Sequence, residues 1–157
     1  MNLKIAFIGR AEALKFIEDD ENLEDGKVDF ISVSDTNKEK EHMHNVWKIT
    51  KGPMSAAIFL NFADTEDEYS SGLTDAKVDK IIEFLAETKK QNKMLLVHCF
   101  AGISRSAAIA KYYRDFYNID CQQLVGYEMH NRMVYNALME RSGITTLRSH
   151  YRSLEVK

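Results

Sequence analysis

Cys99 and Arg105 are the two residues of this sequence whose types and spacing most clearly suggest chemistry. They lie in a segment that reads His98, Cys99, Phe100, Ala101, Gly102, Ile103, Ser104, Arg105, Ser106. A cysteine thiolate is a strong nucleophile, and the planar guanidinium of arginine offers paired donors that match two oxygens of a phosphate group. The pair therefore predicts a site in which a cysteine attacks a bound phosphate ester.

The residues between them are predicted to form the phosphate-binding loop. A loop between a strand end and a helix start can turn several backbone N–H groups toward a dianion, and the helix terminus adds partial positive charge. Gly102 permits the backbone angles that such a curl needs. The same field favours the thiolate of Cys99 and lowers its pKa. We expect six residues to bind the phosphate: Phe100, Ala101, Gly102, Ile103, Ser104 and Arg105.

Strand-length apolar stretches alternate with segments that have the apolar spacing of helices. The predicted strands are Leu3 to Ile8, Val28 to Val33, Ala56 to Phe62 and Met94 to Val97. The predicted helices are Ala11 to Glu18, Asp75 to Leu85 after an N-cap at Thr74, Ala107 to Tyr117, and one or two over Gln122 to Glu140 with a C-terminal cap at Gly143. Lys38 to Thr50 has no readable pattern. The alternation predicts an α/β fold with a mostly parallel central sheet flanked by helices, whose ligand sites lie beyond the carboxyl ends of the strands.

Length and composition are those of an ordinary globular protein, and we expect residues 1–157 to form a single domain. The net charge of -3 offers no general attraction to nucleic acid, and the longest apolar runs are too short to cross a membrane. We therefore predict neither a nucleic-acid nor a membrane partner. With two cysteines and no secretory signal, a reducing, cytoplasmic location is expected.

The segment His98 to Ser106 resembles the signature of the protein tyrosine and dual-specificity phosphatase superfamily, a histidine and cysteine followed, after five residues, by arginine and serine. The likeness extends more loosely from Asn61 to Leu138, and the chain length is similar to that of the small single-domain members.

The resemblance implies a protein tyrosine phosphatase-like fold and a metal-independent hydrolysis through a cysteinyl-phosphate intermediate. Cys99 would be the nucleophile and Arg105 the phosphate clamp. The resemblance also implies that His98 supports the loop and the thiolate, and that Ser106 helps the thiolate leave during hydrolysis.

The departing oxygen of a phosphate ester needs a proton, so we expect a carboxylic acid on a loop facing the phosphate site. The acidic stretch Ala63 to Ser71 follows a predicted strand and contains Asp64 and Asp67. The resemblance favours Asp64, because the family carries its acid on such a loop upstream of the cysteine, and Asp67 is the alternative. A plain solvated acidic surface is the competing interpretation of this stretch.

The leading interpretation is a phosphatase that acts on phosphotyrosine in proteins, with phosphoserine and phosphothreonine as further candidate substrates and with phosphate or another oxyanion bound in the loop. The alternatives are a catalytically weak phosphopeptide-binding module, a phosphatase of a non-protein ester such as a phosphoinositide or an RNA 5′ end, and a sulfur-transfer domain. The variable loop positions are Phe100, Ala101, Ile103 and Ser104. All are uncharged, so they add no support for a strongly anionic substrate.

The remaining reactive side chains are predicted to be structural. The other histidines have no metal-ligand spacing, so neither a metal nor another cofactor is expected. Cys121 is interpreted as a packed thiol rather than a redox partner of Cys99. Asn131 and Arg132 weakly match a segment that flanks the loop in related phosphatases.

Overall fold

The computed structural model describes residues 3–19, 26–50 and 56–155, and it contains a sheet of parallel strands. The strands are β1 (Ile5–Ile8), β2 (Val28–Ser34), β3 (Ala57–Asn61) and β4 (Met94–His98), in the spatial order β1-β4-β2-β3. Each lies within two residues of its predicted bounds. The prediction of an α/β fold with a parallel sheet is confirmed.

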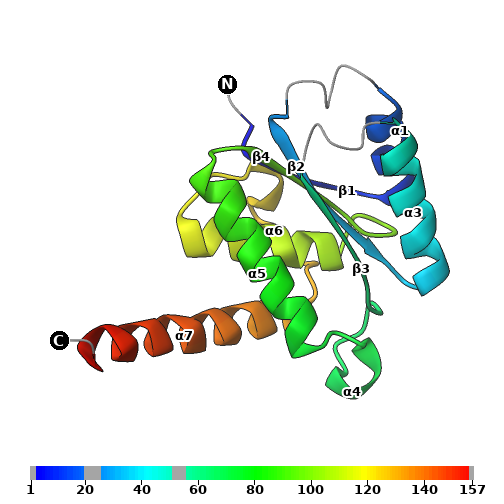
Figure 1. The fold of residues 1–157 in the computed structure, drawn as a ribbon. Helices are drawn as coiled ribbons and strands as arrows, with labels where there is room; N and C mark the ends of the chain where they lie inside the picture. The colour runs from blue at the N-terminus through cyan, green and yellow to red at the C-terminus, as the bar shows by residue number, and fades with distance from the viewer. Residues whose placement is uncertain (1–2, 20–25, 51–55, 156–157) are drawn as a thin grey trace.

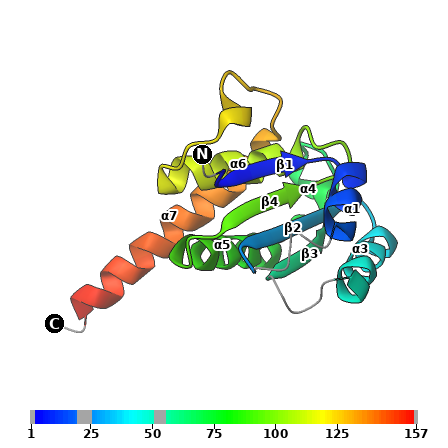
Figure 2. The ribbon, with the colours of Figure 1, turned by 90° about the horizontal axis from the view of Figure 1, so that it is seen from above.

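Helices cover both faces of the sheet (Figures 1 and 2). One face carries α1 (Arg10–Glu18) and α3 (Asn37–Thr50), and the other carries α5 (Asp75–Lys90), α6 (Arg105–Tyr117) and α7 (Arg132–Glu155). A short helix, α4 (Glu68–Ser71), forms the last part of the acidic stretch, and a 3-10 turn, η1 (Gln122–Leu124), follows α6. The N-cap predicted at Thr74 is present, because its hydroxyl accepts a hydrogen bond from the N–H of Lys77 at 3.3 Å.

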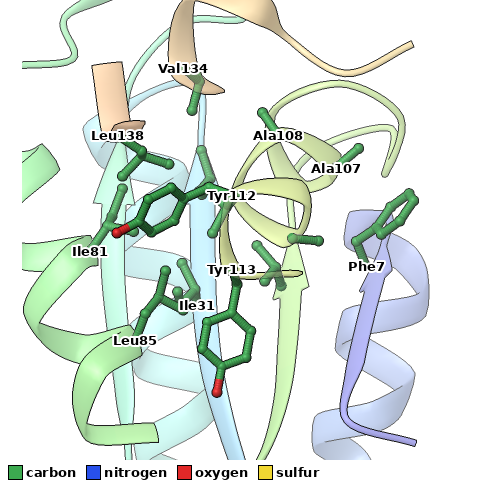
Figure 3. Packing of buried hydrophobic residues seen from close by; sticks show 14 of the residues in the cluster. Phe7, Ile31, Ile81, Leu85, Ala107, Ala108, Tyr112, Tyr113, Val134 and Leu138 are labelled. Atoms are coloured by element: carbon green, nitrogen blue, oxygen red, sulfur yellow. The ribbon is translucent and has the colours of Figure 1, made fainter. Parts of the chain in front are cut away.

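The larger core lies between the sheet and α6, which is packed at its centre (Figure 3). Ala107 and Ala108 are fully buried, and their small side chains let the start of the helix lie close to the sheet. Tyr112 and Tyr113 fill the space toward α5 and α7, and the Tyr112 hydroxyl hydrogen-bonds Ser142 of α7. This packing fixes the N-terminus of α6, where the predicted phosphate-binding loop ends.

The opposite face has a smaller aromatic core. The Phe30 ring stacks on the Trp47 ring with centroids 5.1 Å apart and on the His98 ring at 5.4 Å. His98 therefore packs against the core between the sheet and the helices α1 and α3. Cys99, the next residue, lies in the core on the other face of the sheet.

The segment 38–50, for which no structure was predicted, forms α3. Only a narrow stripe of this polar helix is buried, including Met43 and Trp47, four positions apart. Thr36 directly precedes the helix, and its hydroxyl accepts a hydrogen bond from the N–H of Glu39 at 3.2 Å. A threonine followed three residues later by glutamate is a capping-box pattern. This capping-box pattern was the sequence signal that could have predicted the start of α3.

The predicted helical segment Gln122 to Glu140 was wrong at both ends. Its first part is only the turn η1 and an irregular stretch, because the side chain of Gln123 bonds the backbone of Phe7 through both its oxygen and its nitrogen, at 2.9 Å each. Gly143 is not a C-terminal cap, since α7 continues to Glu155. A glycine inside a helix costs only about 1 kcal/mol, which packing of the preceding turns outweighs.

Candidate active site

The segment from Cys99 to Ser104 lies at the carboxyl end of β4, between the ends of β1 and β2. His98 pairs with Ile8 of β1 on one side and with Ser32 of β2 on the other. The chain leaves β1 toward α1 on one face and leaves β4 toward α6 on the other, which creates a topological switch point. Ligands of open α/β sheets bind at such points.

The first turn of α1 supports the outside of this loop. The N–H of Arg10 donates to the carbonyl of Phe100 at 3.0 Å. Gly102 has a φ of +72°, and a Cβ there would lie 2.3 Å from the backbone nitrogen of Gly9. A Cβ on Gly9 would in turn lie 3.2 Å from the carbonyl oxygens of Phe100 and Ala101. Two glycines therefore let two backbone segments meet.

The Cys99 side chain is 2% exposed, and its Sγ lies 3.2 Å from the hydroxyl oxygen of Ser106. Burial alone would raise the pKa of the thiol. The Ser106 hydroxyl, the backbone N–H groups of Ser106 and Gly102, and the charge of Arg105 outweigh burial and hold the pKa of Cys99 below its ordinary value. The loop thus favours a nucleophilic thiolate.

His98 is buried and holds the backbone of the loop. Its Nδ1 lies 3.2 Å from the carbonyl oxygen of Cys99, which can only accept, so Nδ1 carries the hydrogen. Its Nε2 therefore accepts from the Ser32 hydroxyl at 2.6 Å. Burial, together with the charges of Arg10 and Arg105, lowers the pKa of His98 to about 4 against the opposing effect of the Cys99 carbonyl. At neutral pH the ring is uncharged.

Arg105 is 3% exposed, and its guanidinium is held by two contacts outside the loop. Its Nη1 donates to the carbonyl oxygen of Phe62 at 2.7 Å and to the Asp35 carboxylate at 2.6 Å. Its Nε is buried and has no hydrogen-bond partner among the described residues. A buried donor without a partner is costly unless a ligand completes it. The anchoring therefore leaves Nε free for an oxyanion.

Of the two acidic candidates, Asp64 is the one that lies against the phosphate-binding loop. Its Oδ1 accepts from the Ser104 hydroxyl at 2.7 Å and from Nδ2 of Asn131 at 3.0 Å. Asn131 is 2% exposed and also donates to the carbonyl of Thr65 at 3.0 Å, so it ties the acidic loop to the start of α7. Asp64 and Asn131 therefore join the acidic loop to Ser104.

Asp67 has a different position, because it caps α4. Its carboxylate accepts from the N–H of Tyr69 and from the Ser70 hydroxyl, each at 3.1 Å. Both oxygens are therefore engaged within its own helix, as an N-cap residue requires.

At the rim of the site, the loop and the neighbouring connection expose several apolar side chains, together with the charged Glu128. The side chains of Phe100 and Ile103 are 62% and 41% exposed, and Val125 and Met129 from the neighbouring connection are also exposed. That connection is held against the loop by Tyr127, whose hydroxyl donates to the carbonyl of Ile103. No charged side chain comes from the loop between Cys99 and Arg105.

Cys121 lies at the other end of β1. Its Sγ is 3.9 Å from the carbonyl oxygen of Ile5, whereas the N–H of Cys99 donates to Ile8, three residues farther along the strand. Three strand residues span about 10 Å, more than a disulfide allows between the two Cα atoms. Both cysteines are free thiols, and burial raises the pKa of Cys121.

Residues 3–19, 26–50 and 56–155 contain neither a metal-binding cluster nor a membrane-spanning helix. No three histidine, cysteine, aspartate or glutamate side chains there converge as a metal-binding group. None of the helices in these ranges combines the length and the apolar character of a membrane span.

The family model "Dual specificity phosphatase, catalytic domain" matches residues 26–152. The chain belongs to the dual-specificity phosphatase family. The matched region begins at β2 and contains the loop, Arg105 and the acidic segment. Among curated proteins, none matches this dual-specificity phosphatase sequence.

Solved structures show the same fold at low identity. The dual-specificity phosphatase chain is 17% identical to PTPMT1, with a TM-score of 0.54, over 94% of this chain and 95% of that one. It is 18% identical to the PTP-2 phosphatase of Cydia pomonella, with a TM-score of 0.52 and coverage of 89% and 84%. For the human tyrosine phosphatase-like serine/threonine/tyrosine-interacting protein the identity is 19%, the TM-score 0.50 and the coverage 77% and 80%.

Several residues at the site were not expected from the sequence of this dual-specificity phosphatase. Gly9 and Asp35 directly follow β1 and β2, and Ser32 lies two residues before the end of β2. The carboxyl ends of these strands meet at the loop, and this position at the strand ends was the sequence signal for the three residues. The carbonyl of Phe62 carries no sequence signal at all. Asn131, weakly matched before, lies between the loop and Asp64.

Proposed function

We propose that this chain hydrolyses phosphate esters on proteins, phosphotyrosine above all, with Cys99 as nucleophile, Arg105 as phosphate clamp and Asp64 as general acid. The observation that carries the proposal is the convergence of three groups on one loop. The thiol of Cys99 has a lowered pKa, Arg105 keeps a buried Nε without a partner, and Asp64 bonds the Ser104 hydroxyl.

The reaction proceeds in two balanced steps. In the first, the Cys99 thiolate forms a bond to phosphorus while the bond from phosphorus to the ester oxygen breaks, and Asp64 gives its proton to that oxygen. The backbone N–H groups of the loop and Arg105 hold the charge on the phosphoryl oxygens.

In the second step water attacks the cysteinyl phosphate. The Asp64 carboxylate takes a proton from this water, the bond between phosphorus and sulfur breaks, and inorganic phosphate is released. The Ser106 hydroxyl, 3.2 Å from Sγ, donates to the sulfur as its negative charge returns. Neither step needs a metal or an organic cofactor, and we propose none.

The rim supports an aromatic leaving group. Phe100 and Ile103 are exposed beside the phosphate-binding loop, and apolar surface there contacts whatever carries the phosphate. A strongly anionic ester would meet no basic side chain within the loop. Phosphotyrosine is therefore favoured over a phosphoinositide or an RNA 5′ end.

The test is hydrolysis, in the presence of EDTA, of p-nitrophenyl phosphate and of three peptides that differ only in carrying phosphotyrosine, phosphoserine or phosphothreonine. We expect the phosphotyrosine peptide to have the highest kcat/KM of the three, and Cys99→Ser to abolish turnover while still binding vanadate. Binding of the phosphopeptides without turnover by the unmodified protein would instead support a phosphopeptide-binding module.

A further inference from the structure

The free edge of the sheet carries unpaired backbone groups. β3 is the last strand and pairs only with β2. The N–H of Phe62 donates to Ser34 at 3.1 Å, and alternate residues of a strand direct their backbone groups to the same side. The N–H and carbonyl groups of Ala57 and Phe59 therefore point away from β2. No hydrogen bond to them occurs within the described residues.

A groove of about 310 Å³ lies over this edge, where Figure 1 shows β3 between α3 and α5. The edge strand forms its floor, through Ala57, Ile58 and Phe59. Side chains of the two helices form its walls: Lys40, Glu41 and His44 from α3 and Lys80 from α5. A groove with a strand edge as its floor fits an extended polypeptide.

The walls carry an excess of positive charge. Lys40 and Lys80 line the groove, and Lys77 lies at its end, where its Nζ donates to the carbonyl of Asn61. Burial and the nearby charge of Lys40 lower the pKa of Lys77, so these ammonium groups share a positive environment. The single acidic wall residue, Glu41, accepts a hydrogen bond from Asn37 at 3.2 Å.

The strand has little of the usual protection of an edge, because Lys77 covers the outward carbonyl of Asn61 but no described residue bonds the outward groups of Ala57 and Phe59. Its sequence, Ala57–Asn61, contains neither lysine nor proline, the residues with which proteins commonly prevent strand addition. A second copy of the chain is a poor occupant, because pairing of two such edges would bring the lysines of both copies together. Acidic side chains on the added strand would instead be attracted.

We propose that an extended acidic segment of a polypeptide partner adds to β3 as a further parallel or antiparallel strand. The main-chain groups of Ala57 and Phe59 supply the strand pairing, and Lys40 and Lys80 contact the carboxylates. Phe59 pairs with Ser32, and Ser32 with His98, so the added strand would lie three strand spacings, about 14 Å, from β4. This surface is separate from the Cys99 loop, and the proposal does not depend on the catalytic chemistry.

The probe is a capped, fluorescent heptapeptide with two adjacent glutamates at its centre and valines on either side, so that one carboxylate faces each helix. Its binding is followed by fluorescence anisotropy and by ¹⁵N NMR of the protein. We expect saturable binding that weakens with salt, with shift changes centred on the amides of Ala57 and Phe59. A matched peptide with lysine in place of glutamate, and one N-methylated at alternate amides, should each bind at least tenfold more weakly.

Two protein variants separate charge from backbone pairing. Lys40→Glu combined with Lys80→Glu should weaken binding of the glutamate peptide about tenfold or more, and the exposed Lys15→Glu on α1 should not. Ala57→Pro removes one outward N–H at the first strand residue, where proline is tolerated, and should also weaken binding.

Unchanged hydrolysis of p-nitrophenyl phosphate by these variants would show that they are folded, since none of the substituted residues belongs to the catalytic site. Equal binding of the glutamate and lysine peptides, absence of binding, or displacement of the peptide by vanadate would each overturn the proposal.

Discussion

Arg105, at the end of the predicted phosphate-binding loop, forms an ion pair with Asp35, with Nη1 2.6 Å from Oδ1. The same Nη1 also donates to the carbonyl of Phe62. Both protons of Nη1 are therefore used, and the guanidinium is held with its Nε free. Asp35 thereby restricts the orientation of the guanidinium that we propose as the phosphate clamp.

We predict that Asp35→Ala weakens vanadate binding about threefold to tenfold, which corresponds to loss of an orienting contact worth about 1 kcal/mol. The measurement is the inhibition constant of vanadate against p-nitrophenyl phosphate. Asp35→Asn retains an acceptor and should have an intermediate effect. Tighter vanadate binding by Asp35→Ala would show instead that the carboxylate competes with the oxyanion for Arg105.

Cys99 should be alkylated by iodoacetamide well before Cys121, with a pH dependence centred below the ordinary thiol pKa. The hydrogen bonds of Ser106 and Gly102 and the charge of Arg105 stabilise its thiolate, whereas burial raises the pKa of Cys121. Peptide mapping at a series of pH values measures both rates. Ser106→Ala removes one donor and should move the Cys99 curve to higher pH. Faster alkylation of Cys121 would contradict the assignment.

His98 should make the free energy of unfolding depend on pH. Its pKa is about 4 in the folded protein and near 6.5 when unfolded, so the unfolded state binds more protons between these values. The stabilisation is complete above pH 6.5 and decreases as the pH falls toward 4, by up to about 3 kcal/mol.

Urea unfolding of wild type and His98→Asn over this range measures the effect as a difference, which removes the contribution of carboxylates common to both proteins. We expect the two stabilities to converge as the pH falls. A constant difference from pH 6.5 to 4 would show that His98 has the same pKa in the folded and the unfolded protein.

Gly102→Ala should be far more harmful than Gly126→Ala. Both glycines have φ near +70°, but a Cβ at position 126 meets no atom within 4 Å, whereas at 102 it lies 2.3 Å from the nitrogen of Gly9. The control should lose about 1 kcal/mol, from backbone conformation alone. Gly102→Ala should lose more stability, measured by urea unfolding, and its vanadate binding. Equal losses would mean that the contact of the loop with β1 is unimportant.

The parts of the structure that depend on residues close together in the sequence could be predicted from it. The four strands and the start of α6 follow from local apolar patterns, and the loop follows from a compact motif. α3 was missed because its buried stripe is narrow, and the irregular stretch after η1 was missed because Gln123 bonds a distant strand. Asp35 and Gly9 meet the loop only through the strand order β1-β4-β2, which no local pattern specifies. The catalytic roles of the motif residues stay predictions.

The least certain role by sequence was that of the general acid, for which Asp64 and Asp67 were both candidates. Asp64 bonds Ser104 of the phosphate-binding loop, and Asp67 caps α4. The two residues lie on one acidic segment and have similar chemistry, so each is the matched control for the other.

We predict that Asp64→Asn loses most kcat/KM toward a phosphotyrosine peptide and much less toward p-nitrophenyl phosphate. The phenol of tyrosine is a poor leaving group that needs the proton, whereas p-nitrophenolate leaves largely without it. The variant should also lose the fall of kcat/KM at high pH, because that limb requires a protonated acid. Asp67→Asn should keep both features of the wild type and nearly all of its stability, because asparagine caps a helix about as well as aspartate. Leaving-group dependence in Asp67→Asn alone would transfer the role to Asp67, and its absence from both variants would place the proton donor elsewhere.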